Sequence, residues 1–425
     1  MTTIYPPPRG RHLLTADRRF STGGGLVSRI IGRGAARLLD RIDSGLEQGS
    51  IRLRLPDGSE RTLGGRKPGP DATVALNSWR ALVRLAVSGS VGWFRAWMEG
   101  EWESPDPVAL FELFMVNRIS LGEAGRASGP NRLFNRLVRT FQANTRTGAR
   151  RNINFHYDLG NDFYQAWLDE TLTYSSAVFA EPVSAAEPLE QAQARKVRLL
   201  LDRLDLKPGD RLLEIGSGWG YLAETAARQY GAQVTSITLS EEQLAHARAR
   251  VERAGLADRV TFSLTDYRDV DGRFDAIASV EMVEAVGQEY WPDFLGAVAR
   301  VLRPGGKAAV QFISIDEAIF EGYARNADFI QTYIFPGGLL ISERRFRAIA
   351  EGHGLSWEDR KGYAAHYAET LRRWRERFDA AVSEARLPPG FDAHFHRLWR
   401  YYLMYCEGGF RGGGIDVAQV TLQKI

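Results

Sequence analysis

The chain contains the run Leu212-Leu213-Glu214-Ile215-Gly216-Ser217-Gly218-Trp219-Gly220. Its apolar half predicts a buried strand, and its three alternate glycines predict a tight turn that leads into a helix. Glycine accepts positive φ and lets a ligand approach the backbone, because it carries no Cβ. The first amides of a following helix have partial positive charge and suit an anionic or carboxylate ligand. Such a turn alone also fits a structural role or a dinucleotide site, so the neighbouring segments are needed to decide between these uses.

The segments after the turn continue an alternation of strands and helices. Residues 233–240 are rich in β-branched side chains and predict a second strand, and Ser240 before Glu241 and Glu242 predicts a helix start. A dinucleotide-binding fold would place Asp or Glu at the end of that strand to hold a ribose. This strand instead ends in Thr238-Leu239-Ser240, which argues against NAD.

Three further motifs follow in order. They are Asp266-Tyr267-Arg268, the apolar run Phe274 to Glu281, and the turn Leu302-Arg303-Pro304-Gly305-Gly306-Lys307. With the glycine turn they resemble an S-adenosylmethionine-dependent methyltransferase of the doubly wound α/β class. The resemblance implies a Rossmann-like class I methyltransferase domain and S-adenosylmethionine as the cofactor.

Composition narrows the class of protein. The 425 residues leave room for one large and one smaller domain, and 44% hydrophobic with 25% charged residues is an ordinary globular balance. A single cysteine, Cys406, excludes an intrachain disulfide framework. Among the seven histidines only His394 and His396 are close together, so no metal site is expected. No apolar run reaches the roughly 20 residues of a membrane span, and Met1 to Gly10 does not resemble a signal peptide, so we expect a soluble protein.

Charge is divided unevenly along the chain. Residues 1–150 hold 23 Lys and Arg against 13 Asp and Glu, whereas the remainder is acidic and the net charge is +3. A basic segment beside an acidic domain indicates a polyanionic surface such as anionic lipid as partner, although a solvated arginine-rich face has the same composition. No nucleic-acid reader motif is present, so nucleic acid is not expected.

Periodicity predicts the other elements of the chain. In the N-terminal part we expect helices at 26–46, 80–98 and 107–116 and a strand at 51–55. After the Pro-Gly-Gly turn we expect a strand at 307–315, an insertion at 316–340 that commonly builds a substrate lid, a helix from Ser342 to about Glu351, a helix around Trp374 and a strand at 417–422.

Five motifs narrow the family. They are Asn154 to Tyr164 (NFHYDLGNDFY), Leu172 to Phe179 (LTYSSAVF), Glu281 to Gly287 (EMVEAVG), His366-Tyr367, and Arg400 to Phe410 (RYYLMYCEGGF). Together they resemble the cyclopropane-fatty-acid synthase family over about residues 150–425, and Trp97 to Trp102 (WMEGEW) extends the similarity into the N-terminal part. The resemblance implies a mainly helical lipid- or membrane-associated domain at 1–125, a linker at 126–150 and a catalytic domain at 151–425. It also implies a homodimer in the cytoplasm, peripherally bound to the inner face of the membrane.

The family transfers the methyl group of S-adenosylmethionine to a cis double bond in a phospholipid acyl chain. An alkene is a poor nucleophile, so the sulfonium methyl must be held in line with it, about 3–3.5 Å away in a dry pocket. The carbocation that results needs aromatic faces and negative charge nearby, and a base must then remove one proton. In this family a bound bicarbonate ion is thought to be that base.

The resemblance implies specific roles for individual residues. The bicarbonate pocket would involve Ser176, Glu284, Gln311, Ile313 and Tyr367, with Glu284 accepting a proton from the ion and Tyr367 donating to it. Cysteine is usual where Ser176 stands and histidine where Gln311 stands; glutamine donates a hydrogen bond but carries no proton. The cofactor would be bound by Tyr174, Ser175, Gly216, Ser217, Gly218, Thr238, Leu239, Gln243, Asp266 and Tyr267. The acyl chain would be bound by Phe329, Tyr333, Phe335, Trp374 and Tyr401.

The sequence leaves the product open. Loss of a proton from the transferred methyl closes a cyclopropane ring, which is the favoured expectation. Loss from a neighbouring chain carbon instead gives a methylated unsaturated chain, a precursor of branched or furan-containing acyl chains. A catalytically silent lipid-binding homologue is the alternative of another class, and a methyltransferase for a small soluble metabolite is a third.

Overall fold

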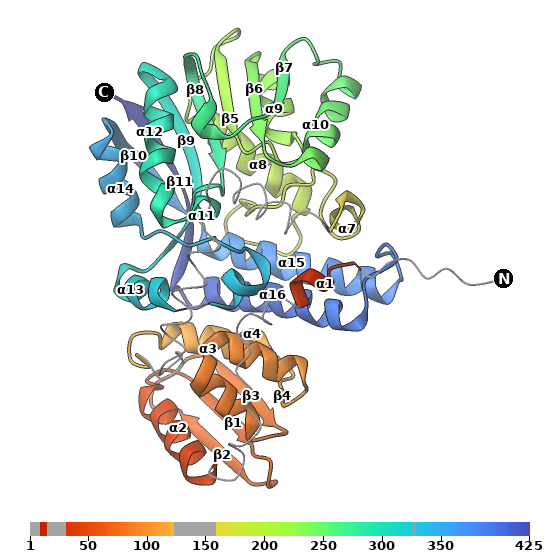
Figure 1. Cartoon of the computed structure of the whole chain (residues 1–425), viewed down its shortest axis with the longest axis vertical. Helices are drawn as coiled ribbons and strands as arrows, with labels where there is room; N and C mark the ends of the chain where they lie inside the picture. The colour runs from red at the N-terminus through yellow and green to blue at the C-terminus, as the bar shows by residue number, and fades with distance from the viewer. Residues whose placement is uncertain (1–8, 15–30, 123–158, 327) are drawn as a thin grey trace, which may run out of the picture. The chain divides into compact units, whose positions relative to one another are not determined.

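The computed structural model describes residues 9–14, 31–122, 159–326 and 328–425 (Figure 1). The predicted linker at 126–150, the beginning of the predicted helix at 26–46 and the first part of the motif at 154–164 lie outside these ranges. The chain forms two compact units. Unit 1 comprises Met1–Gln142, Asp316–Pro336 and Pro389–Ile415, and unit 2 comprises Ala143–Ile315, Gly337–Pro388 and Asp416–Ile425. The functional roles expected for the domains at 1–125 and 151–425 stay predictions.

Unit 2 is built on a seven-stranded sheet with the strand order β10-β11-β9-β8-β5-β6-β7. The strands are β5 (Arg211–Ile215), β6 (Gln233–Thr238), β7 (Val260–Leu264), β8 (Phe274–Val280), β9 (Leu302–Ile315), β10 (Leu355–Gly362) and β11 (Ile415–Lys424). β5 pairs in parallel with β6 and β8, β6 with β7, and β8 with β9, whereas β10 and β11 are antiparallel. This mostly parallel sheet with flanking helices confirms the predicted doubly wound α/β fold.

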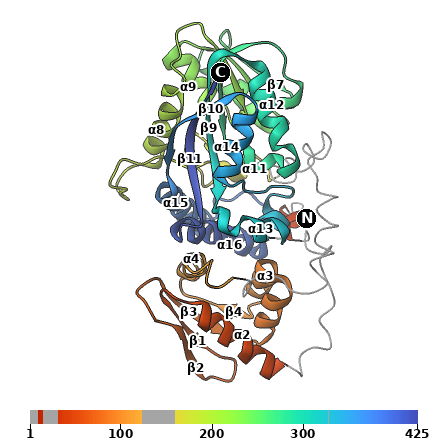
Figure 2. The same ribbon diagram turned by 90° about the vertical axis from the view of Figure 1, so that its left-hand side faces the viewer.

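Helices cover both faces of this sheet, with α8 and α9 on one face and α12 and α14 on the other (Figure 2). The helices of unit 2 are α7 (Asn161–Gln165), α8 (Leu189–Asp202), α9 (Tyr221–Tyr230), α10 (Glu241–Arg253), α11 (Val283–Val286), α12 (Trp291–Val301), α14 (Glu343–Gly352) and α15 (Ala364–Ser383), with 3-10 turns η2 (Tyr267–Asp269) and η3 (Gln288–Tyr290). Leu212 of β5 and Ala276 and Ala278 of β8 pack in the core that α8, α9 and α10 close. Side chains of a strand alternate between the two faces of the sheet. Because Ala276 and Ala278 of β8 are small, the helices on their face can approach the sheet closely.

Unit 1 contains a four-stranded sheet with the order β2-β1-β3-β4. Its elements are α1 (Arg11–Leu14), α2 (Ile31–Gly45), β1 (Ser50–Arg54), β2 (Glu60–Gly64), β3 (Asp71–Leu76), α3 (Arg80–Met98), β4 (Trp102–Glu103), α4 (Pro107–Val116), α13 (Glu317–Arg325), the π-helical turn η4 (Ile330–Ile334) and α16 (Ala393–Arg411). The predicted helices at 80–98 and 107–116 are confirmed. β2, β3 and β4 were not predicted from the sequence.

The family motif at 400–410 lies in α16, where a glycine permits close helix packing. A Cβ at Gly408 would lie 2.5 Å from the Phe111 Cβ and 2.9 Å from the Glu112 amide nitrogen, both in α4. A side chain at position 408 would therefore push α4 away from α16. Part of this motif thus serves the packing of unit 1.

Candidate active site

The predicted cofactor turn connects β5 with α9 at the carboxyl edge of the sheet. Gly216 has φ +99° and Gly218 has φ +49°, a region that residues with a Cβ rarely adopt. The amides of Gly216 and Ser217 both donate to the Ile237 carbonyl at 3.0 Å, which ties the turn to β6. A Cβ at Gly218 would meet no atom within 4 Å, so the backbone there is open to close approach by a ligand. The turn therefore fits the cofactor that was expected to bind it.

Side chains beneath the turn hold it rigidly. The Ser236 hydroxyl lies 2.7 Å from the Ser217 hydroxyl and donates to the Glu214 carboxyl group. Burial raises the pKa of Glu214 to about 8. These three residues are buried, so they form a polar support below Gly216 and Gly218 and leave the open side of the turn to the ligand.

The residues predicted for the ribose and adenine follow β6 and β7 along the same edge. The Thr238 hydroxyl donates to the Gln243 side-chain carbonyl at 3.2 Å, next to the half-buried Leu239. Asp266 forms an ion pair with Arg268 at 2.6 Å and caps η2, while Tyr267 packs edge-on against Phe294. Because parallel strands end at one edge, these side chains lie on the same side of the sheet as the glycine turn.

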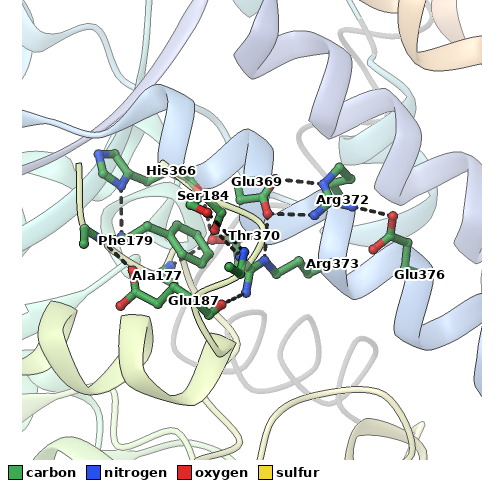
Figure 3. A network of polar contacts seen from close by, with 12 residues as sticks. Ala177, Phe179, Ser184, Glu187, His366, Glu369, Thr370, Arg372, Arg373 and Glu376 are labelled. Carbon is green, nitrogen blue, oxygen red and sulfur yellow. Dashed lines mark hydrogen bonds and ion pairs between the residues drawn. The ribbon is translucent and has the colours of Figure 1, made fainter. Parts of the chain in front are cut away.

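The segment directly after Ser176 is fastened to α15 through Ala177 and Phe179 (Figure 3). The amide of Ala177 donates to the Thr370 hydroxyl at 3.1 Å, and the amide of Phe179 donates to His366 Nδ1 at 3.0 Å. Arg373 binds the backbone carbonyls of Ser184, at 2.8 Å, and Glu187. His366 therefore has a structural role in the motif His366-Tyr367, and the segment lies beside the part of α15 that presents Tyr367.

Tyr174 and Ser175 have distinct surroundings. The Tyr174 ring packs 5.2 Å from Trp374 and 5.8 Å from Trp167, which makes an aromatic wall. The Ser175 hydroxyl accepts a hydrogen bond from the buried Lys196 ammonium at 2.7 Å. Burial lowers the pKa of Lys196 to about 8, although neighbouring carboxylates, that of Glu281 first, oppose the shift.

Three of the predicted pocket residues converge on the carboxylate of Glu281, which the sequence did not single out. The Ser176 amide and the Gln311 side-chain amide donate to its Oε1 at 2.9 and 2.8 Å. The Tyr367 hydroxyl donates to its Oε2 at 2.8 Å. An acidic residue directly after β8, at the carboxyl edge of the sheet, was the signal for Glu281.

A second amide fixes the orientation of Gln311. Gln419 Nε2 in β11 donates to Gln311 Oε1 at 3.0 Å, so the Gln311 NH2 group points toward Glu281. The same NH2 group reaches the Ser176 carbonyl at 3.3 Å. Gln311 is 1% exposed in an otherwise apolar strand, and these partners satisfy an amide that would be costly to bury alone.

Glu284 lies beside Glu281 and differs from it in its bonding. Its Oε1 accepts from the Ile313 amide, whereas its buried Oε2 has no hydrogen-bond partner among the described residues. Burial and the neighbouring Glu281 raise the pKa of Glu284 to about 8. Glu284 therefore holds a proton at pH 7. The structure thus brings all five residues predicted for the pocket into one cluster around Glu281: Ser176, Glu284, Gln311, Ile313 and Tyr367.

The structure does not bring the five predicted acyl-chain residues together in one unit. Trp374 belongs to unit 2, and the other four belong to unit 1. Phe329, Tyr333 and Tyr401 are each at most 1% exposed and pack around Phe94 of α3, with ring centroids 4.5 to 5.0 Å apart, while Phe335 is half-buried against Tyr402. They form core of unit 1, and their contact with substrate stays a prediction.

The donor set expected for bicarbonate does not fit that ion in this structure. Ser176, Gln311 and Tyr367 already donate to both oxygens of the Glu281 carboxylate. A second anion at the same donors would lie within a few ångströms of this carboxylate, where like charges repel strongly. The donors at this site are therefore taken by the protein's own carboxylate.

Comparisons with known proteins agree with the geometry. The family "Mycolic acid cyclopropane synthetase" matches residues 144–420. The chain is 43% identical to tuberculostearic acid methyltransferase UfaA1 of Mycobacterium tuberculosis, over 80% of each chain. It is 34% identical to cyclopropane-fatty-acyl-phospholipid synthase of Escherichia coli K12, over 80% of this chain and 85% of that one. The solved structure of mycolic acid cyclopropane synthase CmaA1 with SAH and CTAB superposes with a TM-score of 0.60 at 32% identity, over 65% of this chain and 98% of that one.

These matches confirm the resemblance inferred from the motifs, and they support S-adenosylmethionine as the cofactor, since CmaA1 was solved with its demethylated product SAH. The chain belongs to the mycolic acid cyclopropane synthetase family of S-adenosylmethionine-dependent lipid methyltransferases.

Proposed function

We propose that the chain transfers the methyl group of S-adenosylmethionine to a cis double bond of an unsaturated acyl chain carried by a phospholipid. The observation that supports this most is the half-buried acidic cluster of Glu281 and Glu284, which follows β8 on the same sheet edge as the open glycine turn. A carbocation formed there would gain a negative charge and a proton acceptor. The cluster supplies both without a His–Asp or Ser–His pair.

The proposed methyl transfer needs no reactant besides S-adenosylmethionine, the alkene and a proton acceptor. S-adenosylmethionine, when bound, supplies an electrophilic methyl group on sulfur. The π electrons of the alkene form the new C–C bond, the C–S bond breaks toward sulfur, and the positive charge moves to the second alkene carbon. The aromatic wall of Tyr174, Trp167 and Trp374 offers π faces to that cation and excludes water. A carboxylate then removes one proton.

Two products follow from the two protons available. Ring closure is the product expected from the family resemblance. The second candidate, a methylated unsaturated chain, is favoured by a specific observation: a side-chain carboxylate stands in the donor set expected for bicarbonate. A base carried on a side chain in that donor set can select the other proton. The 43% identical relative bears the name of a methyltransferase, not of a cyclopropane synthase, which favours the same candidate.

The partner surface is part of the proposal. The excess of basic residues in positions 1–150 suits the anionic face of a lipid bilayer, at about 1 kcal/mol for each basic residue near the surface. Among helices in the described ranges, none has the length and apolar character needed to cross a bilayer. In line with what the family resemblance implies, the proposal places the protein peripherally on the cytoplasmic face of the membrane, as a homodimer.

The test is analysis of acyl chains after reaction. The protein is incubated with S-adenosylmethionine and vesicles of cis-monounsaturated phosphatidylglycerol, and the chains are examined by mass spectrometry and NMR. A gain of one CH2 supports the proposal; upfield ring protons identify a cyclopropane, and a retained vinyl signal identifies the methylated alkene. No gain with intact lipid binding indicates the silent homologue, and turnover on free metabolites alone indicates the third reading; either result refutes the proposal.

A further inference from the structure

We propose that the Glu281 carboxylate is the catalytic base of this protein, that it takes the place of a bound bicarbonate ion, and that turnover does not require bicarbonate. This inference rests on the proposed methyl transfer. It concerns which group accepts the proton, so it can fail while the methyl transfer itself stands.

Three donors from separate elements surround the Glu281 carboxylate. The Ser176 amide, the Gln311 NH2 group and the Tyr367 hydroxyl come from the segment before α8, from β9 and from α15, and all lie 2.8 to 2.9 Å from a Glu281 oxygen. Three donors from separate elements on one carboxylate are an oxyanion site already filled by a side chain. Gln419 locks the Gln311 amide in the donating orientation, so this arrangement is built into the fold.

The backbone at Glu281 is strained. Glu281 has φ +51°, in the left-handed region that residues with a Cβ rarely adopt. Its amide donates to the Gln311 carbonyl at 2.7 Å, which helps to hold the conformation. Glycine would adopt this φ without strain and would leave the three donors open to a small anion. The strain is tolerated in the one conformation that directs the carboxylate into the donor set.

Charged and polar groups from three helices face the Glu281 carboxylate. The Lys196 ammonium on α8 attracts it, Tyr367 on α15 donates to it, and Glu284 on α11 is its acidic neighbour. Burial raises the pKa of Glu281 above its ordinary value while these donors and Lys196 oppose the shift. Burial also leaves Glu284 protonated at pH 7, so Glu284 adds no second negative charge beside Glu281. A carboxylate with a raised pKa is a better proton acceptor than an ordinary one.

The proton step is simple to balance. One Glu281 oxygen accepts a proton from the transferred methyl, whose C–H electrons close the ring, or from the adjacent chain CH2, whose C–H electrons form the new double bond. The positive charge of the substrate and the negative charge of Glu281 are both cancelled. The proton returns to water after the product leaves, so no further reactant is needed.

The experiment compares the whole protein and three variants in buffer freed of carbon dioxide, with and without millimolar bicarbonate. Formation of S-adenosylhomocysteine on the unsaturated vesicles is followed for wild type, Glu281→Gln, Glu281→Gly and the control Glu289→Gln. Glu289 is an exposed carboxylate in η3 of the same connection. S-adenosylmethionine affinity measured by calorimetry shows that each variant is folded.

We expect wild type and Glu289→Gln to turn over equally with and without bicarbonate. Glu281→Gln, which keeps shape but accepts no proton, should lose about 10²- to 10⁴-fold in rate while it still binds S-adenosylmethionine. Glu281→Gly should be inactive without bicarbonate and regain activity with it, because its donors are then open. In a thermal shift assay bicarbonate should raise the Tm of Glu281→Gly and not that of wild type.

Other results overturn the inference. Wild type that needs bicarbonate, or Glu281→Gln that reacts at the wild-type rate, would show that Glu281 is not the base while methyl transfer stands. Wild type that forms no S-adenosylhomocysteine under either condition would refute the proposed function itself, and this inference with it.

Discussion

The pH profile of a Tyr367→Phe variant tests the acidic cluster most directly. The substitution removes the hydroxyl that donates to Glu281 Oε2 at 2.8 Å and keeps the ring, which packs edge-on 6.1 Å from Trp374. A hydrogen bond to a charged group contributes about 1.5–3 kcal/mol. One pKa unit corresponds to about 1.4 kcal/mol, so the loss should raise the pKa of Glu281 by about one to two units.

The direction of the change in the pH profile depends on which protonation state of Glu281 reacts. The base acts as a carboxylate, so activity falls as the pH drops through its pKa. Removing a donor that stabilises the carboxylate raises this pKa and moves the acid limb of the kcat profile to higher pH by about one to two units. The assay is formation of S-adenosylhomocysteine on unsaturated vesicles over a range of pH.

The matched control is Tyr230→Phe. Tyr230 at the end of α9 also donates to a carboxylate, Asp202, at 2.6 Å, but this pair is exposed. The control should leave the acid limb in place. A Tyr367→Phe limb that does not move, or that moves to lower pH, would refute the assignment of Glu281 as the titrating base and of Tyr367 as its donor.

Two further predictions concern stability and cofactor binding. Burial raises the pKa of Glu284 to about 8, whereas the pKa in the unfolded chain is near 4.5, so ionisation of Glu284 destabilises the folded protein increasingly as the pH rises between these values. The Tm of Glu284→Gln relative to that of wild type should therefore be higher at pH 8.5 than at pH 6. A Tm difference that is the same at both pH values would show that folding does not raise the pKa of Glu284. Gly216→Ala places a Cβ 2.7 Å from Met282 at φ +99° and should weaken both folding and S-adenosylmethionine affinity. The control Gly209→Ala has φ +90° and no atom within 4 Å of the added Cβ, so it should lower the Tm without changing the S-adenosylmethionine affinity measured by calorimetry. An equal loss of affinity in the two variants would exclude a specific role of the glycine turn in cofactor binding.

Much of unit 2 was predictable because its signals are local. The apolar run ending in Gly216 and Gly218, the Ser240 helix cap and the strand at 307–315 depend on neighbouring residues, and each is confirmed. The family motifs likewise brought Ser176, Gln311, Ile313 and Tyr367 into the candidate site. Short-range periodicity and turn chemistry are enough to establish the fold class.

Two features depend on contacts between distant parts of the chain. Unit 1 takes in residues 316–336 and 389–415, because α16 packs on α4 where Gly408 allows it; no local pattern marks such a division. Glu281 meets donors 105, 30 and 86 residues away along the chain. Sequence alone thus determined a methyltransferase fold and most members of the candidate site. Only the tertiary structure decided which carboxylate takes the donors, because a φ of +51° and three converging hydrogen bonds exist only after folding.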